Sequence, residues 1–161
     1  MPVDWAMTQL NLGAALQNLG DCKSAIAAYR AALEVFTRTN RPAHWAMTQA
    51  NIGDALTSLG NVERSPARLE EAVAAYRAAL EIRNRGEMRV LWAMTQNSLA
   101  MALKSLGEQR KSHAQLSEAR AAVIAALEVQ PEDLYFIHTL RNIDEALSIL
   151  GDRAVGGTTE S

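Results

Sequence analysis

The sequence has little of what several classes of protein depend on. It has one cysteine, Cys22, so no disulfide can form within the chain, and a small buried thiol is the simplest role for it. Lysine and arginine (16) do not outnumber aspartate and glutamate (18), and the net charge is −2. That balance lacks the basic excess of nucleic-acid-binding and membrane-surface proteins. There is no run of 18 apolar residues, and the N-terminus has no basic or apolar region typical of a secretion signal. We therefore expect a soluble cytoplasmic protein that binds neither nucleic acid nor membrane.

Aromatic residues are scarce too, at 5% of the chain, although 48% of the residues are hydrophobic. An apolar fraction made largely of alanine and aliphatic residues favours closely packed helices over a sheet, whose strands prefer aromatic and β-branched residues. The length of 161 residues is sufficient for one domain.

A five-residue phrase, Trp-Ala-Met-Thr-Gln, occurs three times, at residues 5–9, 45–49 and 92–96. A Leu-Gly pair follows each copy at the same offset, ending at Gly20, Gly60 and Gly107. The copies are 40 and then 47 residues apart. Recurrence at this spacing is typical of a repeat array in which each unit is one supersecondary element.

Each unit contains two helical patterns. In the first unit, apolar residues spaced by three and four predict two amphipathic helices, one through Trp5, Leu12 and Leu19 and one through Ala25, Tyr29, Ala32 and Phe36. Gly20 is predicted to end the first helix and Asp21 to cap the second. The same pattern predicts helix ends at Gly60, Gly107 and Gly151.

Units two and three are longer than unit one, with seven extra residues between Gly60 and Ala72. Ser65 followed by Pro66 predicts a helix start, and Ser112 with Gln115 predicts a capping box. We therefore expect the second helices to begin earlier in these units. The predicted boundaries are units at about 3–40, 41–87 and 88–131, connections containing Pro42, Gly86 and Pro131, a last helix at 134–150 and a flexible tail at 152–161.

The small and large positions of these units resemble a tetratricopeptide repeat. The matching residues are Asn11, Leu12, Gly13, Gly20, Ala25, Tyr29, Ala32 and Leu33 in unit one, with counterparts in unit two (Asn51, Ile52, Gly53, Gly60, Ala72, Tyr76, Ala79, Leu80) and looser ones in unit three (Leu99, Ala100, Gly107, Ala119, Val123, Ala126, Leu127). The resemblance covers roughly residues 3–151. Because the units exceed the usual length of about 34 residues, they are most similar to kinesin-light-chain repeats and to arrays in large bacterial regulatory proteins.

The resemblance implies an all-α solenoid of about three helix-turn-helix units plus a C-terminal capping helix. It also implies that two helices cross closely at Gly13 and Gly53. Asp144 stands at the equivalent place in the last helix, where a buried carboxylate would be costly. We therefore expect no helix to cross at Asp144.

In such an array the first helices line a concave surface that binds peptides. The residues expected there are Met7, Asn11, Met47, Asn51, Asp54, Met94, Ser98, Met101, His138 and Asn142. An asparagine amide can both donate to and accept from a peptide backbone, and methionine adapts to varied apolar partners. The alternative is that the methionines pack the interior and the amides fill the helix surface. The positions of the family's carboxylate clamp hold Leu10, Ala14, Met94 and Ser98, which predicts that this chain has no clamp.

No pattern typical of catalysis is present. His44, His113 and His138 are isolated in different units, and no phosphate, dinucleotide or nucleophile motif occurs. We expect no enzyme activity, metal or cofactor. The favoured function is a non-catalytic scaffold that binds a protein or peptide. The alternatives are self-assembly, as a homodimer through an uncapped first unit, or a fragment of a larger regulatory or signalling protein; reading of RNA is disfavoured by the acidic balance.

Overall fold

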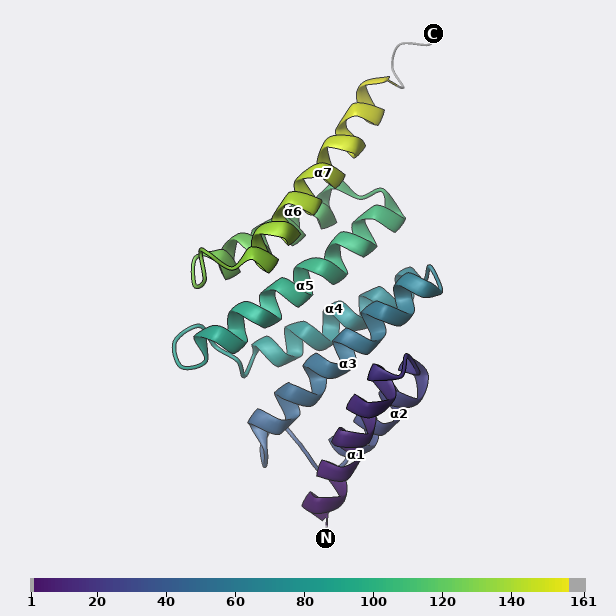
Figure 1. Cartoon of the computed structure of the whole chain (residues 1–161), viewed down its shortest axis with the longest axis vertical. Coiled ribbons are helices and arrows are strands. Elements are labelled where there is room, and N and C mark those ends of the chain that lie inside the picture. The colour runs from purple at the N-terminus through teal and green to yellow at the C-terminus, as the bar shows by residue number, and fades with distance from the viewer. Residues whose placement is uncertain (1, 157–161) are drawn as a thin grey trace.

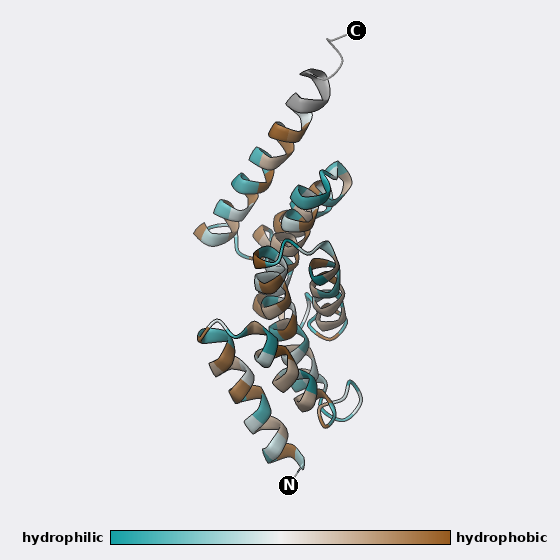
Figure 2. Cartoon of the chain, turned by 90° about the vertical axis from the view of Figure 1, so that its right-hand side faces the viewer, coloured by the Kyte–Doolittle hydropathy of each residue, from teal (hydrophilic) through white to brown (hydrophobic). Residues whose placement is uncertain are grey.

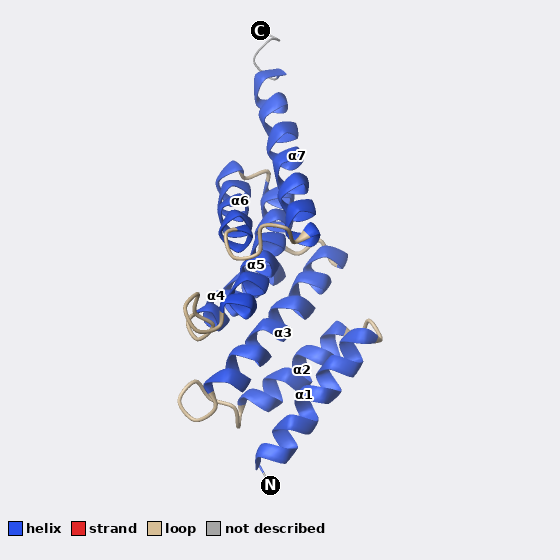
Figure 3. Ribbon diagram, turned by 60° about the vertical axis from the view of Figure 1, so that its left-hand side comes forward, coloured by secondary structure: helices blue, strands red, loops and turns tan. Residues whose placement is uncertain are grey.

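The structure is a computed structural model that describes residues 2–156, and these form seven helices with no strand. The helices are α1 (Pro2–Asn18), α2 (Cys22–Leu33), α3 (Pro42–Val62), α4 (Pro66–Leu80), α5 (Arg89–Arg110), α6 (His113–Leu127) and α7 (Leu134–Gly156). They stack as antiparallel pairs in sequence order, with the N- and C-termini at opposite ends (Figure 1). The first helices, α1, α3, α5 and α7, pack against one another in order, whereas the backbones of the second helices, α2, α4 and α6, lie further apart and are linked through side chains such as Arg30 and Glu71 (Figure 3). The all-α solenoid is confirmed.

Short polar residues start the second helix of each unit. Asp21 Oδ1 accepts a hydrogen bond from the backbone N–H of Ser24 at 3.1 Å, and Ser65 Oγ accepts one from Arg68 at 3.4 Å. Each bond satisfies a backbone donor that the helix itself leaves unpaired. Ser112 caps α6 in the same way, but its own N–H donates to Gly107 rather than to Gln115, so only half of the predicted capping box forms. Pro42, expected in a connection, is instead the first residue of α3.

The repeated pattern predicts that every Leu-Gly pair ends a helix, but in the structure only some of them do. Gly20 does, with a φ of 83° that L-residues rarely adopt. In unit two the helix continues past Gly60 because that glycine serves packing instead: a Cβ there would lie 2.8 Å from Leu69 Cγ. The left-handed residue that follows is Arg64 (φ 50°), and in unit three it is Lys111 (φ 52°).

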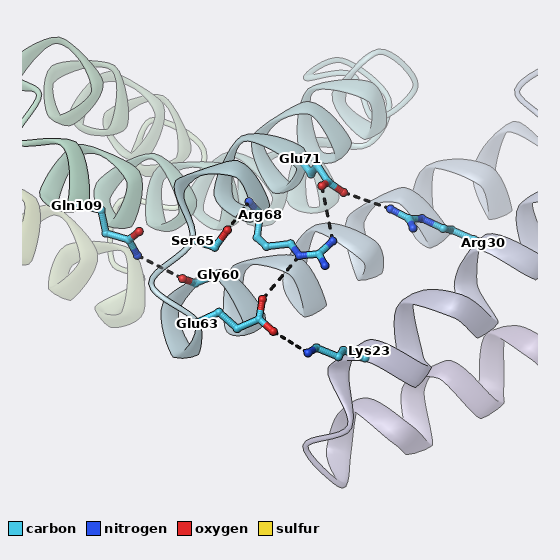
Figure 4. Close-up of polar contacts among 8 residues, drawn as sticks. All are labelled: Lys23, Arg30, Gly60, Glu63, Ser65, Arg68, Glu71 and Gln109. Carbon is cyan, nitrogen blue, oxygen red and sulfur yellow. Dashed lines mark hydrogen bonds and ion pairs between the residues drawn. The ribbon is translucent and has the colours of Figure 1, made fainter.

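The seven extra residues are shared between two helices. Relative to its Leu-Gly pair, α3 runs four residues further than α1, and relative to its core alanine α4 begins three residues earlier than α2. The predicted earlier start of the second helix therefore accounts for the smaller part of the seven extra residues. The added turns make polar contacts with neighbouring units, including Glu63 with Lys23 at 2.7 Å and Gln109 with the carbonyl of Gly60 at 3.3 Å (Figure 4).

The last helix is longer than expected. It runs to Gly156 instead of Leu150, and Gly151 lies within the helix, where an added Cβ would meet no atom within 4 Å. Residues 152–156 of the predicted tail are therefore helical, and residues 157–161 lie outside the described part. Asp144 is exposed and accepts a hydrogen bond from Arg120 Nε at 2.7 Å, as expected for a position that no helix crosses.

The two helices of a unit cross at a glycine facing a tyrosine. A Cβ on Gly53 would lie 2.6 Å from Tyr76 Cε1, and Gly13 faces Tyr29 in the same way. In unit three, Ala100 stands in place of the glycine and Val123 in place of the tyrosine, and both are fully buried. A larger residue on one helix is thus matched by a smaller one on the other, which keeps the crossing close-packed.

Candidate binding surface

The ten residues predicted to line a peptide surface all lie on the first helices. They are Met7 and Asn11 on α1, Met47, Asn51 and Asp54 on α3, Met94, Ser98 and Met101 on α5, and His138 and Asn142 on α7. All ten are at least partly exposed, and Met94 and Met101 are 52% and 37% exposed. These four helices contact one another in order, so the ten residues lie on one continuous series of helices.

The unit-two part of this surface is polar. Tyr76 in α4 donates a hydrogen bond to Asp54 Oδ1 at 2.6 Å, and its hydroxyl lies 3.4 Å from Thr57 Oγ1. Burial raises the pKa of Asp54, while the hydrogen bond from Tyr76 pulls that pKa down. Burial, followed by the nearby Asp54 charge, raises the pKa of Tyr76, so this hydroxyl keeps its proton. The carboxyl group is therefore held in one orientation while remaining partly exposed.

A pocket of about 250 Å³ lies beside the polar part, where α3, the α4–α5 connection and the start of α5 meet. Its lining residues are Ala43, His44, Ala46, Met47, Arg83, Met88 and Leu91. Arg83 is partly buried, and its Nη1 donates a hydrogen bond to Thr95 Oγ1 at 2.8 Å. Burial lowers the pKa of Arg83, and the charge of Asp54 counteracts that shift. The pocket thus offers an apolar volume with one cation at its wall.

The unit-three part is apolar and joins α7. The hydroxyl of Tyr135 donates to Met101 Sδ at 3.0 Å, and Asn97 Nδ2 lies 3.9 Å from the same sulfur. On α7, Asn142 Nδ2 lies 3.2 Å from His138 Nδ1, so these two predicted residues are paired with each other. Met94 has a half-exposed side chain on the same helix as Met101.

Sequence reasoning missed Tyr76, Arg83 and Tyr135 as parts of this surface. In the sequence, Tyr76 stands out only as a residue that matches the repeat; its ring is buried, and the hydroxyl of a buried tyrosine usually finds a polar partner. That rule could have led to Asp54. Arg83 and Tyr135 gave no such signal, since both lie in or next to connections whose course the repeat pattern does not specify.

The described helices carry no group of three histidine, cysteine, aspartate or glutamate side chains arranged to hold a metal ion. Over the same residues, no helix combines the length and the apolar character needed to cross a bilayer.

Comparison with known proteins agrees with this architecture. The family model described as "Tetratricopeptide repeat" matches residues 5–85. The chain is similar to a solved structure, the first tetratricopeptide domain of Spaghetti (RPAP3) bound to the HSP90 peptide SRMEEVD, with a TM-score of 0.60 and 19% identity over 91% of this chain and 98% of that one. No curated protein matches. Since the family model covers half of its length, the chain belongs to the tetratricopeptide repeat family.

Proposed function

We propose that this protein is a non-catalytic scaffold that binds a peptide or helix of a protein partner on the surface formed by α1, α3, α5 and α7. The observation that carries the proposal is the set of methionines on these helices, here called the methionine row: Met94 and Met101 are exposed, and Met7 and Met47 are partly exposed while they pack against the core. Exposed apolar side chains gathered on one face favour an interaction site, and methionine adapts to varied partners.

Polar groups within the row are suited to a main chain. The side chain of Asn51 is partly exposed and can donate to and accept from one peptide unit at once. Asp54 lies one turn further along α3, held by Tyr76, and offers an acceptor already fixed in orientation. A fixed group loses little conformational freedom when it binds, so less of the interaction energy is lost to ordering.

The pocket beside Met47 supplies an anchor for one side chain of the ligand. Its volume of about 250 Å³ and its apolar wall suit a large aliphatic or aromatic side chain. The similar solved structure holds an HSP90 peptide, but the clamp positions of this chain carry Leu10, Ala14, Met94 and Ser98. We therefore expect a ligand held through an internal segment rather than through a terminal carboxylate.

The test is selection of peptides from a random display library, followed by titration of the selected peptides against variants. Asn51→Ala should weaken binding about tenfold, the equivalent of one or two lost hydrogen bonds. Met47→Glu should abolish it by placing a charge in the pocket. Ala121→Glu, on the exposed side of α6, is the matched control and should leave affinity unchanged.

If selected peptides bind all three variants equally well, the ligand occupies another face. Circular dichroism of each variant must match the parent so that a loss of binding reports on the surface rather than on folding.

A further inference from the structure

The outer face of α1 differs from the same face of every later first helix. Leu12 is 46% exposed, whereas its equivalents Ile52, Leu99 and Ile143 are 5%, 6% and 0% exposed. Leu19 is 82% exposed, against 8% for Leu59 and 2% for Leu106. Thr8 is exposed as well, while its equivalents are buried: Thr48, Thr95 and Thr139. The face defined by Trp5, Thr8, Leu12, Ala15 and Leu19, here called the α1 stripe, is thus built like an interior surface.

What covers the equivalent stripe elsewhere is the second helix of the preceding unit. The contacting pairs are α2 with α3, α4 with α5 and α6 with α7. In each pair the second helix runs beside the first helix of the next unit. Apart from Asp4, α1 has no charged residue. Apolar residues recur along this helix, which lies at the N-terminal end of the array (Figure 2). Nothing on this face opposes burial.

Charge placement indicates what the covering helix carries. Arg38, just after the second helix of unit one, pairs with Glu81 of unit two, and Arg85 pairs with Glu128 of unit three at 2.7 Å. Glu34 is the equivalent glutamate of unit one, since the phrase Tyr-Arg-Ala-Ala-Leu-Glu ends at both Glu34 and Glu81. Glu34 is exposed, and no described cation lies within 4.0 Å of it. By analogy with Glu81 and Glu128, the group that would pair with Glu34 is an arginine that follows a second helix.

The C-terminal end of a second copy of the chain does not offer a suitable covering surface for the α1 stripe. The outer face of α7 has Arg141 and Asp144 at positions equivalent to Leu10 and Gly13, and Asp144 already pairs with Arg120. Head-to-tail stacking would therefore bring the α1 stripe against charged residues. A two-fold pair of α1 helices would bury the stripe, but no first helix in the molecule is covered in that way.

We propose that the α1 stripe is a docking surface for a further helix hairpin of this repeat type, carried by a partner segment. The second helix of the hairpin lies along α1, and the residues that follow it bring an arginine to Glu34. This surface is separate from the methionine row, so either proposal can fail without the other.

The test uses a chimera in which a second copy of residues 42–88 is joined directly to residue 2 of the whole chain. Residue 89, which normally follows, is equivalent to residue 2, so the register of the repeats is kept. The added copy brings its own Arg85 to the place that faces Glu34. We expect hydrogen exchange of the α1 amides to slow at least tenfold in the chimera.

Substitutions give the matched comparison. Leu12→Ser should lower the urea midpoint of the chimera clearly and that of the parent chain hardly at all, whereas Leu99→Ser should lower both. Glu34→Gln should lower the midpoint of the chimera slightly and leave the parent unchanged. A chimera that fails to fold, or in which α1 exchanges as fast as in the parent, overturns the proposal.

A parent chain that sediments as a dimer and becomes monomeric on Leu12→Ser also overturns it, because a second copy would then cover the stripe.

Discussion

Units two and three have nearly the same backbone but different interiors. Their first helices have 21 and 22 residues, and their second helices have 15 each and begin at a capping serine. Within unit two, Gly53 faces Tyr76, whereas in unit three Ala100 faces Val123. The close crossing survives because volume lost on one helix is added on the other. The fold therefore depends on the sum of the two side chains and not on either residue alone.

The same exchange changes the surface above it. Tyr76 carries a hydroxyl that fixes Asp54, so unit two presents an oriented acceptor. Val123 has no polar tip, and the residue equivalent to Asp54 is Met101, which accepts from Tyr135 of α7 instead. The proposed binding surface therefore differs between the two units in two linked places: the core pair, and the residue that is Asp54 in unit two and Met101 in unit three.

The largest effect should come from breaking the match in unit two. Gly53→Ala gains helix propensity of up to about 1 kcal/mol, but its Cβ would overlap the Tyr76 ring. Overpacking of this kind costs roughly 1–3 kcal/mol, so the variant should be less stable than the parent. Urea denaturation followed by circular dichroism measures the difference.

Restoring the match should restore stability. Gly53→Ala combined with Tyr76→Val reproduces the pair of unit three and should recover most of the loss. Ala100→Gly is the control in unit three, where helix propensity of about 1 kcal/mol and one buried methyl group are lost without any overlap. A Gly53→Ala chain as stable as the parent would show that the ring moves aside freely.

Much of the fold could be predicted from the sequence, because the repeated phrase and the three-and-four spacing of apolar residues specify which face of each helix is buried. Asp21, Ser65 and Ser112 also specified helix starts by local chemistry. The ends of α3 and α5 could not be read from Gly60 and Gly107, since a glycine looks the same in sequence whether it ends a helix or admits a neighbour; Gly151 does neither, and α7 continues through it. The partners of the surface residues could not be predicted as well, because Arg83 lies in a connection between units and Tyr135 lies at the start of α7, directly after one.

The helix ends themselves give the next largest effect. Lys111 follows α5 with a left-handed backbone, which costs an L-residue roughly 1 kcal/mol relative to glycine. Lys111→Gly should therefore raise the free energy of unfolding by about 1 kcal/mol. Arg64→Gly should gain the same amount if units two and three share one backbone, and Gly20→Ala should lose a similar amount in unit one. Unequal gains in the first two variants would contradict the equivalence of the units. Thermal denaturation is sufficient to measure all three.

A smaller effect is expected from the carboxyl group that unit three lacks. Burial raises the pKa of Asp54 above 3.8, so the folded chain keeps this proton to a higher pH than the unfolded chain does. Its contribution to stability is present below pH 3.8 and is lost as the pH rises through the raised pKa. Asp54→Asn should therefore gain stability relative to the parent over that rise, because the amide has no proton to lose.

Tyr76→Phe removes the hydrogen bond that lowers the pKa of Asp54, so the pH-dependent fall should become steeper. Parallel stability profiles for the parent and Asp54→Asn, measured by urea denaturation from pH 3 to pH 8, would mean that Asp54 titrates alike in both states.

The smallest effect concerns ion pairs on the second helices. Arg30 pairs with Glu71 at 3.2 Å, and Arg77 pairs with Glu118, the equivalent residues one unit later. All four side chains are about half exposed, and exposed pairs contribute roughly 0.2–1 kcal/mol. A double-mutant cycle with Arg77→Gln and Glu118→Gln should give a coupling at the lower end of that range, which falls further in 1 M salt.

The cycle on Arg30 and Glu71 should give a larger value, because Arg68 also lies 3.6 Å from Glu71 and 3.8 Å from Glu63, which extends that pair into a network (Figure 4). Equal couplings at the two sites would show that these pairs act singly and that the network adds nothing to the contact between units.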